Sequence, residues 1–292
     1  MMRDILNEKR DLINHHLCTL LYADCIQHER LYEAMNYSLE AGGKRIRPIL
    51  FLLVLDILGI DSNSFLDTAC SLECIHTYSL IHDDLPAMDN DDYRRGKLTN
   101  HKVYGAGMAT MAGDGLLTYA FELLANQTQI EPSLRCRLIS ILAKAAGPSG
   151  MVGGQAHDID SENKDLSLRE LQIMDHAKTG CLLCAPVDMA VAVAQISEEE
   201  GQLWHQFASH LGLLFQITDD LLDVNGHLDE MGKMPNQDAA DHKSTYVTIL
   251  GKEEAFSWAK KEAETAKGIL YKLKRDTTML EELVDMLLVR TK

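Results

Sequence analysis

Five aspartates crowd into the stretch "SLIHDDLPAMDNDDYRRGK" at residues 79–97, and two arginines follow them at once. The acidic residues are Asp83, Asp84, Asp89, Asp91 and Asp92, and the basic ones are Arg94 and Arg95. Like charges this close repel, and carboxylates that share a site raise one another's pKa. The run is therefore either a solvated loop or a site where a multivalent cation lies among the carboxylates and an anionic ligand bridges it to the arginines.

A second acidic motif lies in "FQITDDLLD" at residues 215–223. At 100° per residue its polar side chains fall within an arc of about 100° on one helical face: Gln216, Asp219, Asp220 and Asp223. Aspartates that share an exposed face repel, and their leucine and isoleucine neighbours argue against full solvation. Oxygen-only ligands suit Mg²⁺, which keeps several waters and takes other ligands from phosphate. The two motifs together favour metal binding over a solvated surface.

A basic cluster, "AGGKRIRP", carries Lys44, Arg45 and Arg47 after a glycine pair that allows close backbone approach. Arginine is a natural bidentate phosphate ligand, although the segment alone could be an exposed helix N-terminus. Further basic residues with small or hydroxyl neighbours are Lys178 beside Thr179, Lys233 in "GKMPNQD", and Lys243 in "KST". None belongs to a GxxxxGK[ST] loop, so phosphate recognition must come from metal plus side chains.

Helical periodicity dominates the elements that must position these residues. Over residues 204–224 the apolar positions recur at three- and four-residue steps, while alternating strand patterns are scarce. In the first motif we expect His76, Leu80 and Asp83 to share a helix face, and Pro86 to end or turn that helix so that a loop returns Asp89 towards Asp83. No linker divides the chain. The sequence predicts one all-α domain over residues 1–292, a bundle of about ten or more helices.

The composition of the chain limits which binding partners and which cellular location can be expected. The formal net charge of −16 makes nucleic acid and anionic membranes unlikely partners. The apolar run Ile49–Leu55 is too short to span a bilayer, so no stable membrane insertion is expected. Seven cysteines without a disulfide pattern, including the lone CxxC of Cys181 and Cys184, indicate reduced, mostly packed thiols. We therefore expect a cytoplasmic protein.

The motifs "GGKRIRP", "CIHTYSLIHDDLPAMDNDDYRRG", "GGQAHDID", "KTG", "FQITDDLLD" and "KSTY" occur in the order seen in trans-isoprenyl diphosphate synthases, which this chain resembles from about Tyr37 to Tyr246. The seven-residue "DDLPAMD" is similar to bacterial farnesyl diphosphate synthases and to plant-type geranylgeranyl enzymes. The resemblance implies an all-α fold in which the two acidic motifs face each other across a central cavity. It also suggests a homodimer.

The resemblance implies roles for named residues. Mg²⁺, with Mn²⁺ as a possible substitute, would be held by Asp83, Asp89, Asp219, Asp220 and Asp223. An allylic diphosphate would be bound by Arg94, Lys178 and Lys233, with Thr179 and Gln216 beside its carbon chain. The diphosphate of isopentenyl diphosphate would be bound by Lys44, Arg47, His76 and Arg95. The catalytic residues that the resemblance implies are Asp83, Asp84, Asp89, Arg94, Lys178, Thr179, Gln216 and Asp219. Lys243 is a further substrate-binding residue, and Gln155 and Asp158 support the site without ligating.

The implied activity is a chain-elongating prenyl transfer from dimethylallyl and then geranyl diphosphate to isopentenyl diphosphate. The bulky Tyr78, next to the small Ser79 and five residues before Asp83, favours farnesyl diphosphate as the main product. On an ideal helix Tyr78 lies about 140° around from Asp83, so it could instead be an ordinary packed tyrosine. The alternatives are a geranylgeranyl diphosphate synthase and a non-catalytic subunit of an active synthase. A terpene cyclase would lack "GGKRIRP", and a di-iron bundle would need Glu-x-x-His ligands.

Departures from the family pattern occur at three places. Asn236, Gln237 and Asp238 stand where relatives usually have a glycine before an acidic residue, Ala106 stands where a glutamate is frequent, and Gly115 replaces a common alanine. The first departure concerns Asp238 and the turn around it.

Overall fold

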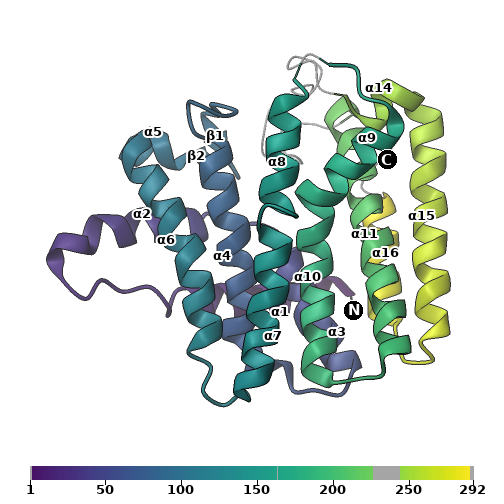
Figure 1. Cartoon of the computed structure of the whole chain (residues 1–292), viewed down its shortest axis with the longest axis horizontal. Coiled ribbons are helices and arrows are strands. Elements are labelled where there is room, and N and C mark those ends of the chain that lie inside the picture. The colour runs from purple at the N-terminus through teal and green to yellow at the C-terminus, as the bar shows by residue number, and fades with distance from the viewer. Residues whose placement is uncertain (1, 163, 226–243, 290–292) are drawn as a thin grey trace. The chain divides into compact units, whose positions relative to one another are not determined.

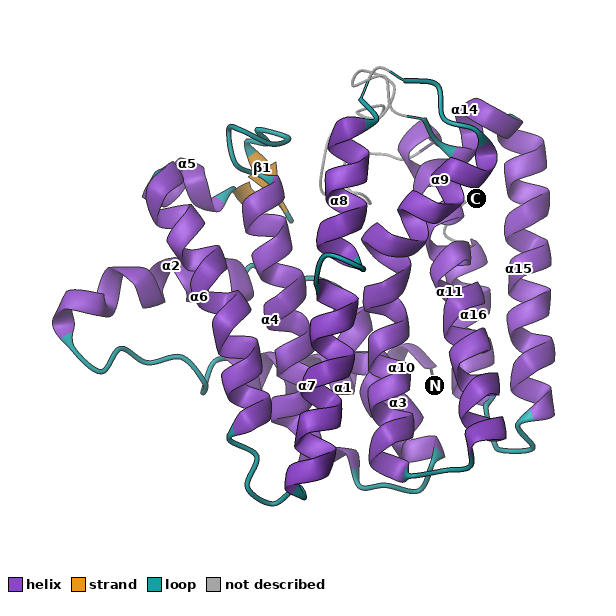
Figure 2. Cartoon of the chain, in the orientation of Figure 1, coloured by secondary structure: helices purple, strands orange, loops and turns teal. Residues whose placement is uncertain are grey.

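The computed structural model describes residues 2–162, 164–225 and 244–289. This part of the chain is built from helices, with one short antiparallel hairpin between them (Figures 1 and 2). The predicted all-α class is confirmed. Two compact units can be distinguished, residues 3–52 with 61–139 (unit 1) and residues 53–60 with 140–292 (unit 2), and each is described by itself. The single domain expected over residues 1–292 stays a prediction.

Unit 1 contains the N-terminal helices, the hairpin and the first acidic motif. Its elements, two of which continue into unit 2, are α1 (Met2–Leu17), η1 (Ile26–His28), α2 (Glu29–Leu39), α3 (Ile46–Ile57), η2 (Ser62–Phe65), α4 (Leu66–Asp83), β1 (Tyr93–Arg94), β2 (Lys97–Leu98), α5 (Asn100–Tyr104), α6 (Ala106–Ala125) and α7 (Pro132–Ala146).

Helix α4 is the central element of unit 1 and lies along α6 (Figure 1). Most of its residues from Thr68 to Ile81 are buried, as expected for a helix that is largely apolar around its whole circumference. Small residues on α6 let the two helices approach. At Gly113 a Cβ would collide with the ring of His82, whose Nε2 donates to the Thr110 carbonyl at 3.0 Å. This packing fixes the end of α4 that carries the first acidic motif.

Unit 2 contains the second acidic motif on its longest helix. Its remaining elements are α8 (Met151–Asp160), α9 (Leu168–Asp175), η3 (His176–Gly180), α10 (Cys181–Ala194), α11 (Glu198–Asn225), α14 (Tyr246–Leu250), α15 (Lys252–Lys272) and α16 (Thr278–Val289). Helix α11 packs along α10 and α15, burying Trp204, Phe207 and Leu211 (Figure 1). The buried stripe recurs at three- and four-residue steps, as the periodicity predicts.

Local capping sets the ends of two helices near the site. Ser167 caps α9 in a capping box with Glu170, and Thr245 caps α14 in the same way with Thr248.

Between α9 and α10 the chain forms η3, a five-residue π-helical turn. Such turns interrupt α-helices mostly at functional positions, and this one holds Lys178 and Thr179.

Candidate active site

The first acidic motif lies at the C-terminal end of α4. Asp83 is the last helical residue, and the chain turns so that the Asp89 backbone N–H donates to the Asp83 carbonyl at 2.9 Å. Asp89 is exposed and Asp83 half-buried. The loop after Pro86 therefore returns Asp89 to Asp83, as the sequence predicts.

Asp84 is buried, and its carboxylate is hydrogen-bonded to Arg94. It accepts hydrogen bonds from Arg94 Nε at 2.9 Å and Arg94 Nη2 at 2.5 Å, and Arg94 also pairs with Asp91 at 2.9 Å. Burial raises the pKa of the Asp84 carboxyl to about 6, although the hydrogen bond from Arg94 opposes the rise. Arg94 is thus tied to the acidic loop that it follows.

The basic residues of unit 1 gather around α4. Lys44 is exposed and Arg47 half-buried, whereas Arg45 between them is buried. Half-buried His76 lies on α4, and burial followed by the charges of Arg47 and Arg95 lowers its pKa well below the ordinary histidine value. His76 is therefore neutral near pH 7 and can donate one hydrogen bond and accept another.

Arg95 occupies the tight turn of the hairpin. Tyr93 pairs with Leu98 and Arg94 with Lys97, so Arg95 and Gly96 form a two-residue loop with φ of +55° and +75°. Positive φ at both positions is the type I′ geometry that joins antiparallel strands. The turn points successive arginines differently, Arg94 to the acidic loop and Arg95 to the Gly42 carbonyl.

The second acidic motif lies on α11. Asp219 is half-buried, whereas Asp220 and Asp223 are 5% and 4% exposed. Asp220 accepts the Gln216 amide at 3.0 Å on one oxygen and the Tyr246 backbone N–H at 2.8 Å on the other. The second aspartate of each motif, Asp84 or Asp220, is thus held by donors of the protein.

Lys178 lies in the π-helical turn η3 and pairs with Asp158 of α8 at 2.6 Å. Thr179 next to it is half-buried. The ion pair connects "GGQAHDID" with "KTG" inside unit 2, and the supporting role expected for Asp158 stays a prediction. Several residues singled out in the sequence lie outside the described residues. They are Lys233, Lys243 and the three residues that depart from the family pattern, Asn236, Gln237 and Asp238.

The expected product-length residues lie on α4. Tyr78 is 5% exposed and packs edge-to-face on His82, with ring centroids 5.7 Å apart. Burial and then the Asp83 charge raise the pKa of Tyr78 to about 12. Half-buried Ser79 donates to the His76 carbonyl at 2.9 Å. These contacts fix the Tyr78 ring, and its role in product length stays a prediction.

Sequence reasoning gave no role to Glu73 and placed Arg45 in the basic cluster as a candidate phosphate ligand, whereas the structure buries Arg45 against Glu73. Both side chains are 1% exposed, and they form an ion pair at 2.5 Å within unit 1. One signal was present in the sequence, since Glu73 is an ionisable residue inside the otherwise uncharged stretch "TACSLECIHTY". Its partner could not be read from spacing.

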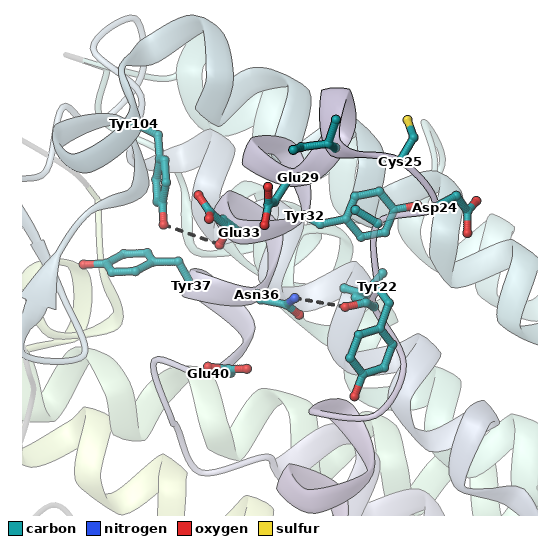
Figure 3. Close-up of a pocket in the computed structure, with 13 residues that line it drawn as sticks. Tyr22, Asp24, Cys25, Glu29, Tyr32, Glu33, Asn36, Tyr37, Glu40 and Tyr104 are labelled. Carbon is teal, nitrogen blue, oxygen red and sulfur yellow. Dashed lines mark hydrogen bonds between the residues drawn. The ribbon is translucent and has the colours of Figure 1, made fainter.

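A separate hollow of about 810 Å³ lies in unit 1 between the 21–26 segment and α2 (Figure 3). Tyrosines and carboxylates line it, among them Tyr32, Tyr37, Glu29 and Glu33, and its lining contains neither lysine nor arginine. An anionic diphosphate would be repelled there. The chemistry of the acidic and basic motifs lies elsewhere.

Metal binding by protein ligands alone is not built into the described residues, where no three histidine, cysteine, aspartate or glutamate side chains come together. The stretch Leu168–Ala194 is long and apolar enough to cross a membrane, but 61% of its most apolar window is buried inside the structure. A core helix of a soluble protein meets the same criterion, so this stretch is not evidence of membrane insertion.

Comparison with known proteins gives one consistent result. The Polyprenyl synthetase family model matches residues 28–287. The chain is 52% identical to a farnesyl diphosphate synthase of Geobacillus stearothermophilus over 223 residues, 76% of this chain and 75% of the relative. It is 46% identical to a geranylgeranyl diphosphate synthase of Cyanophora paradoxa over 82% of this chain and 81% of the relative.

A solved structure agrees with these relatives. The geranyltransferase of Helicobacter pylori, crystallised with magnesium and isoprenyl diphosphate, is similar with a TM-score of 0.86 and 35% identity. The match covers 98% of this chain and 96% of that protein.

Proposed function

The chain belongs to the polyprenyl synthetase family, and we propose that it condenses isopentenyl diphosphate with dimethylallyl and then geranyl diphosphate to give mainly farnesyl diphosphate. Its similarity to farnesyl diphosphate synthases supports this activity. One arrangement of acidic and basic residues in the structure supports the proposal. The Asp83–Asp89 turn leads directly into a hairpin that bears Arg94 and Arg95, so carboxylates and guanidiniums share one loop.

The family uses divalent metal ions, and we propose Mg²⁺ with Mn²⁺ as a substitute. The donor set fits Mg²⁺, because the candidate ligands Asp83, Asp89, Asp219, Asp220 and Asp223 offer only oxygen. Mg²⁺ is commonly held by one or two carboxylates and completes its coordination shell with water and substrate phosphate. When bound, Mg²⁺ neutralises the charge that develops on the diphosphate leaving group.

The basic side chains divide between two substrates in this proposal. Arg94, Lys178 and Lys233 bind the allylic diphosphate. Lys243 is a further substrate-binding residue that is assigned to neither substrate. Lys44, Arg47, His76 and Arg95 bind the diphosphate of isopentenyl diphosphate. Neutral His76 suits that role as a hydrogen-bond donor among cations, because its pKa is lowered by burial and by Arg47 and Arg95.

The reaction needs no protein nucleophile. The allylic C–O bond breaks to leave a carbocation and pyrophosphate, and cationic side chains stabilise the negative charge that the leaving group takes. The double bond of isopentenyl diphosphate attacks the cation, and a proton is then lost to the departing pyrophosphate. Thr179 and Gln216 lie beside the reacting allylic chain in this proposal, in surroundings that exclude water from the cation.

A C15 product is favoured by Tyr78, which is bulky, buried and held against His82. The alternative is geranylgeranyl diphosphate, which the 46% identity to the Cyanophora paradoxa enzyme supports. We further propose a homodimer located in the cytoplasm.

The first experiment asks whether both substrates are required. Purified protein is incubated with Mg²⁺ and geranyl diphosphate, with or without isopentenyl diphosphate, and pyrophosphate release is measured. We expect rapid release only when isopentenyl diphosphate is present. Equal release in its absence would indicate hydrolysis or cyclisation and would overturn the proposal.

A further inference from the structure

Arg45 and Glu73 form a buried ion pair that the proposed chemistry does not use. Arg45 Nη1 donates to Glu73 Oε1 at 2.5 Å, its Nε donates to Asn14 Oδ1 at 2.9 Å, and its Nη2 donates to the Leu39 carbonyl. Both charged side chains are 1% exposed. Buried charges are costly unless they are paired and hydrogen-bonded, so a pair this well enclosed needs a structural or functional reason.

The pair continues to Arg95. Glu73 Oε1 also lies 3.5 Å from Arg95 Nη2, and Arg95 Nη1 donates to the Gly42 carbonyl at 2.5 Å. A Cβ at Gly43 would lie 2.7 Å from Arg95 Cζ, so the absence of a side chain lets the guanidinium lie against this loop. One oxygen of Glu73 therefore joins the 42–47 segment, which is the loop before α3 and the first two residues of α3, to the hairpin turn.

The backbone conformation at Arg45 and Arg95 is unfavourable and must be stabilised by surrounding contacts. Arg45 and Arg95 have φ of +50° and +55°, in the left-handed region that non-glycine residues rarely adopt. Such conformations persist where the surroundings determine them strongly. Both side chains contact the same carboxylate, which offsets the strain at both positions together.

The neighbours of the pair are the residues proposed to bind isopentenyl diphosphate. Lys44 directly precedes Arg45 in the loop, and Arg47 follows two residues later in the first turn of α3. His76 lies three residues after Glu73 on α4, so these two share a helix face. A guanidinium has five N–H donors. Glu73 and the Gly42 carbonyl engage two of those of Arg95, and the group can still donate to a phosphate.

We propose that Glu73 and Arg45 are positioning residues whose buried pair fixes the 42–47 segment and the Arg95 guanidinium for binding the diphosphate of isopentenyl diphosphate. Neither residue touches the substrate. The inference rests on the proposed function, because it assumes that Lys44, Arg47, His76 and Arg95 bind this substrate.

The test uses Glu73→Gln, which keeps the shape of the side chain and removes its charge. We expect the KM for isopentenyl diphosphate to rise by about tenfold or more, because a small displacement of binding groups has effects of this order. The KM for geranyl diphosphate should change by less than about twofold. Thermal unfolding of the same preparation shows how much stability is lost.

A matched control is Glu262→Gln. Glu262 is a buried carboxylate of α15 that accepts hydrogen bonds from Trp258 and His210, and no substrate role is assigned to any of the three. This variant should lower Tm while leaving both KM values unchanged. A lower Tm with two unchanged KM values in Glu73→Gln, or an equal rise in both, would overturn the positioning role.

Arg45→Lys covers the case in which Glu73→Gln does not fold. It keeps a positive charge opposite Glu73 but lacks the fork that reaches Asn14 and Leu39, and the same selective rise in KM is expected. Calorimetric titration with isopentenyl diphosphate alone separates the two proposals. The proposed function is tested by whether the unmutated protein condenses the two substrates. The positioning role is tested separately, because equally tight binding of isopentenyl diphosphate by the unmutated protein and both variants would refute it.

Discussion

Gly154 lies where the backbone of α8 meets the backbone of the π-helical turn that carries Lys178. A Cβ at this position would collide with the Lys178 backbone nitrogen, and it would also lie 2.5 Å from Lys178 Cα and 2.8 Å from the Ala177 carbonyl carbon. All three are backbone atoms and cannot rotate away. Since ordinary contacts begin at 3.4 Å and the Lys178 nitrogen is closer than its Cα, Gly154→Ala must push the two segments apart by about 1 Å or more.

The displacement acts on Lys178, which is proposed to bind the allylic diphosphate and pairs with Asp158 of the same α8 helix. Misplacing a catalytic group by about 1 Å can cost about 100-fold in rate. We therefore expect kcat/KM for geranyl diphosphate to fall by about 10- to 100-fold, with the KM for isopentenyl diphosphate little changed. Overpacking should also lower the free energy of unfolding by about 1 to 3 kcal/mol.

Steady-state condensation kinetics with each substrate varied in turn measure this effect. Gly268→Ala in α15 is the control, because nothing lies within 4 Å of its Cβ. It should leave the kinetics unchanged and stabilise the helix by about 0.5 to 1 kcal/mol. Unchanged kinetics in Gly154→Ala, or equal loss for both substrates, would refute the reasoning.

Three further predictions concern the metal motifs, the product and pH. Asp83→Asn and Asp219→Asn should each reduce turnover by several orders of magnitude with the fold retained by circular dichroism, and comparable rates in EDTA and Mg²⁺ would contradict the metal assignment. Tyr78→Ala should lengthen the product from C15 towards C20, and chromatography without any lengthening would reject that role. Because the pKa of His76 is lowered, its contribution to stability is full above the unfolded value of about 6.5 and is lost as pH falls below it. Tm should thus fall less between pH 7 and pH 5 in His76→Gln than in the unmutated protein, and parallel curves would contradict this.

The helical architecture was accessible from the sequence because the apolar spacing is strong. The helix expected over residues 204–224 is part of α11, which begins earlier, at Glu198. Its first turn, with Glu198, Glu199 and Glu200, has no apolar periodicity, but acidic residues there favour the helix through its dipole. Periodicity finds the buried part of a helix, whereas capping and charge set its end.

The tertiary pairings of the candidate site were less accessible. Motifs identified Asp84, Arg94 and Asp220 as site residues, but the hydrogen bonds that hold Asp84 and Asp220 depend on how a hairpin and α14 return to the motifs. The Arg45–Glu73 pair joins residues 28 positions apart in sequence. Spacing within one helix cannot indicate such a partner, because it depends on packing between separate elements.

The most direct test of the central claim is the chain length of the product. Purified protein is incubated with Mg²⁺, labelled isopentenyl diphosphate and dimethylallyl diphosphate, and the dephosphorylated products are separated by chromatography. The account predicts label mainly in the C15 alcohol farnesol, with the C10 alcohol as a minor product. Label confined to unreacted isopentenyl diphosphate would contradict chain elongation, and a main C20 product would contradict the assignment of farnesyl diphosphate.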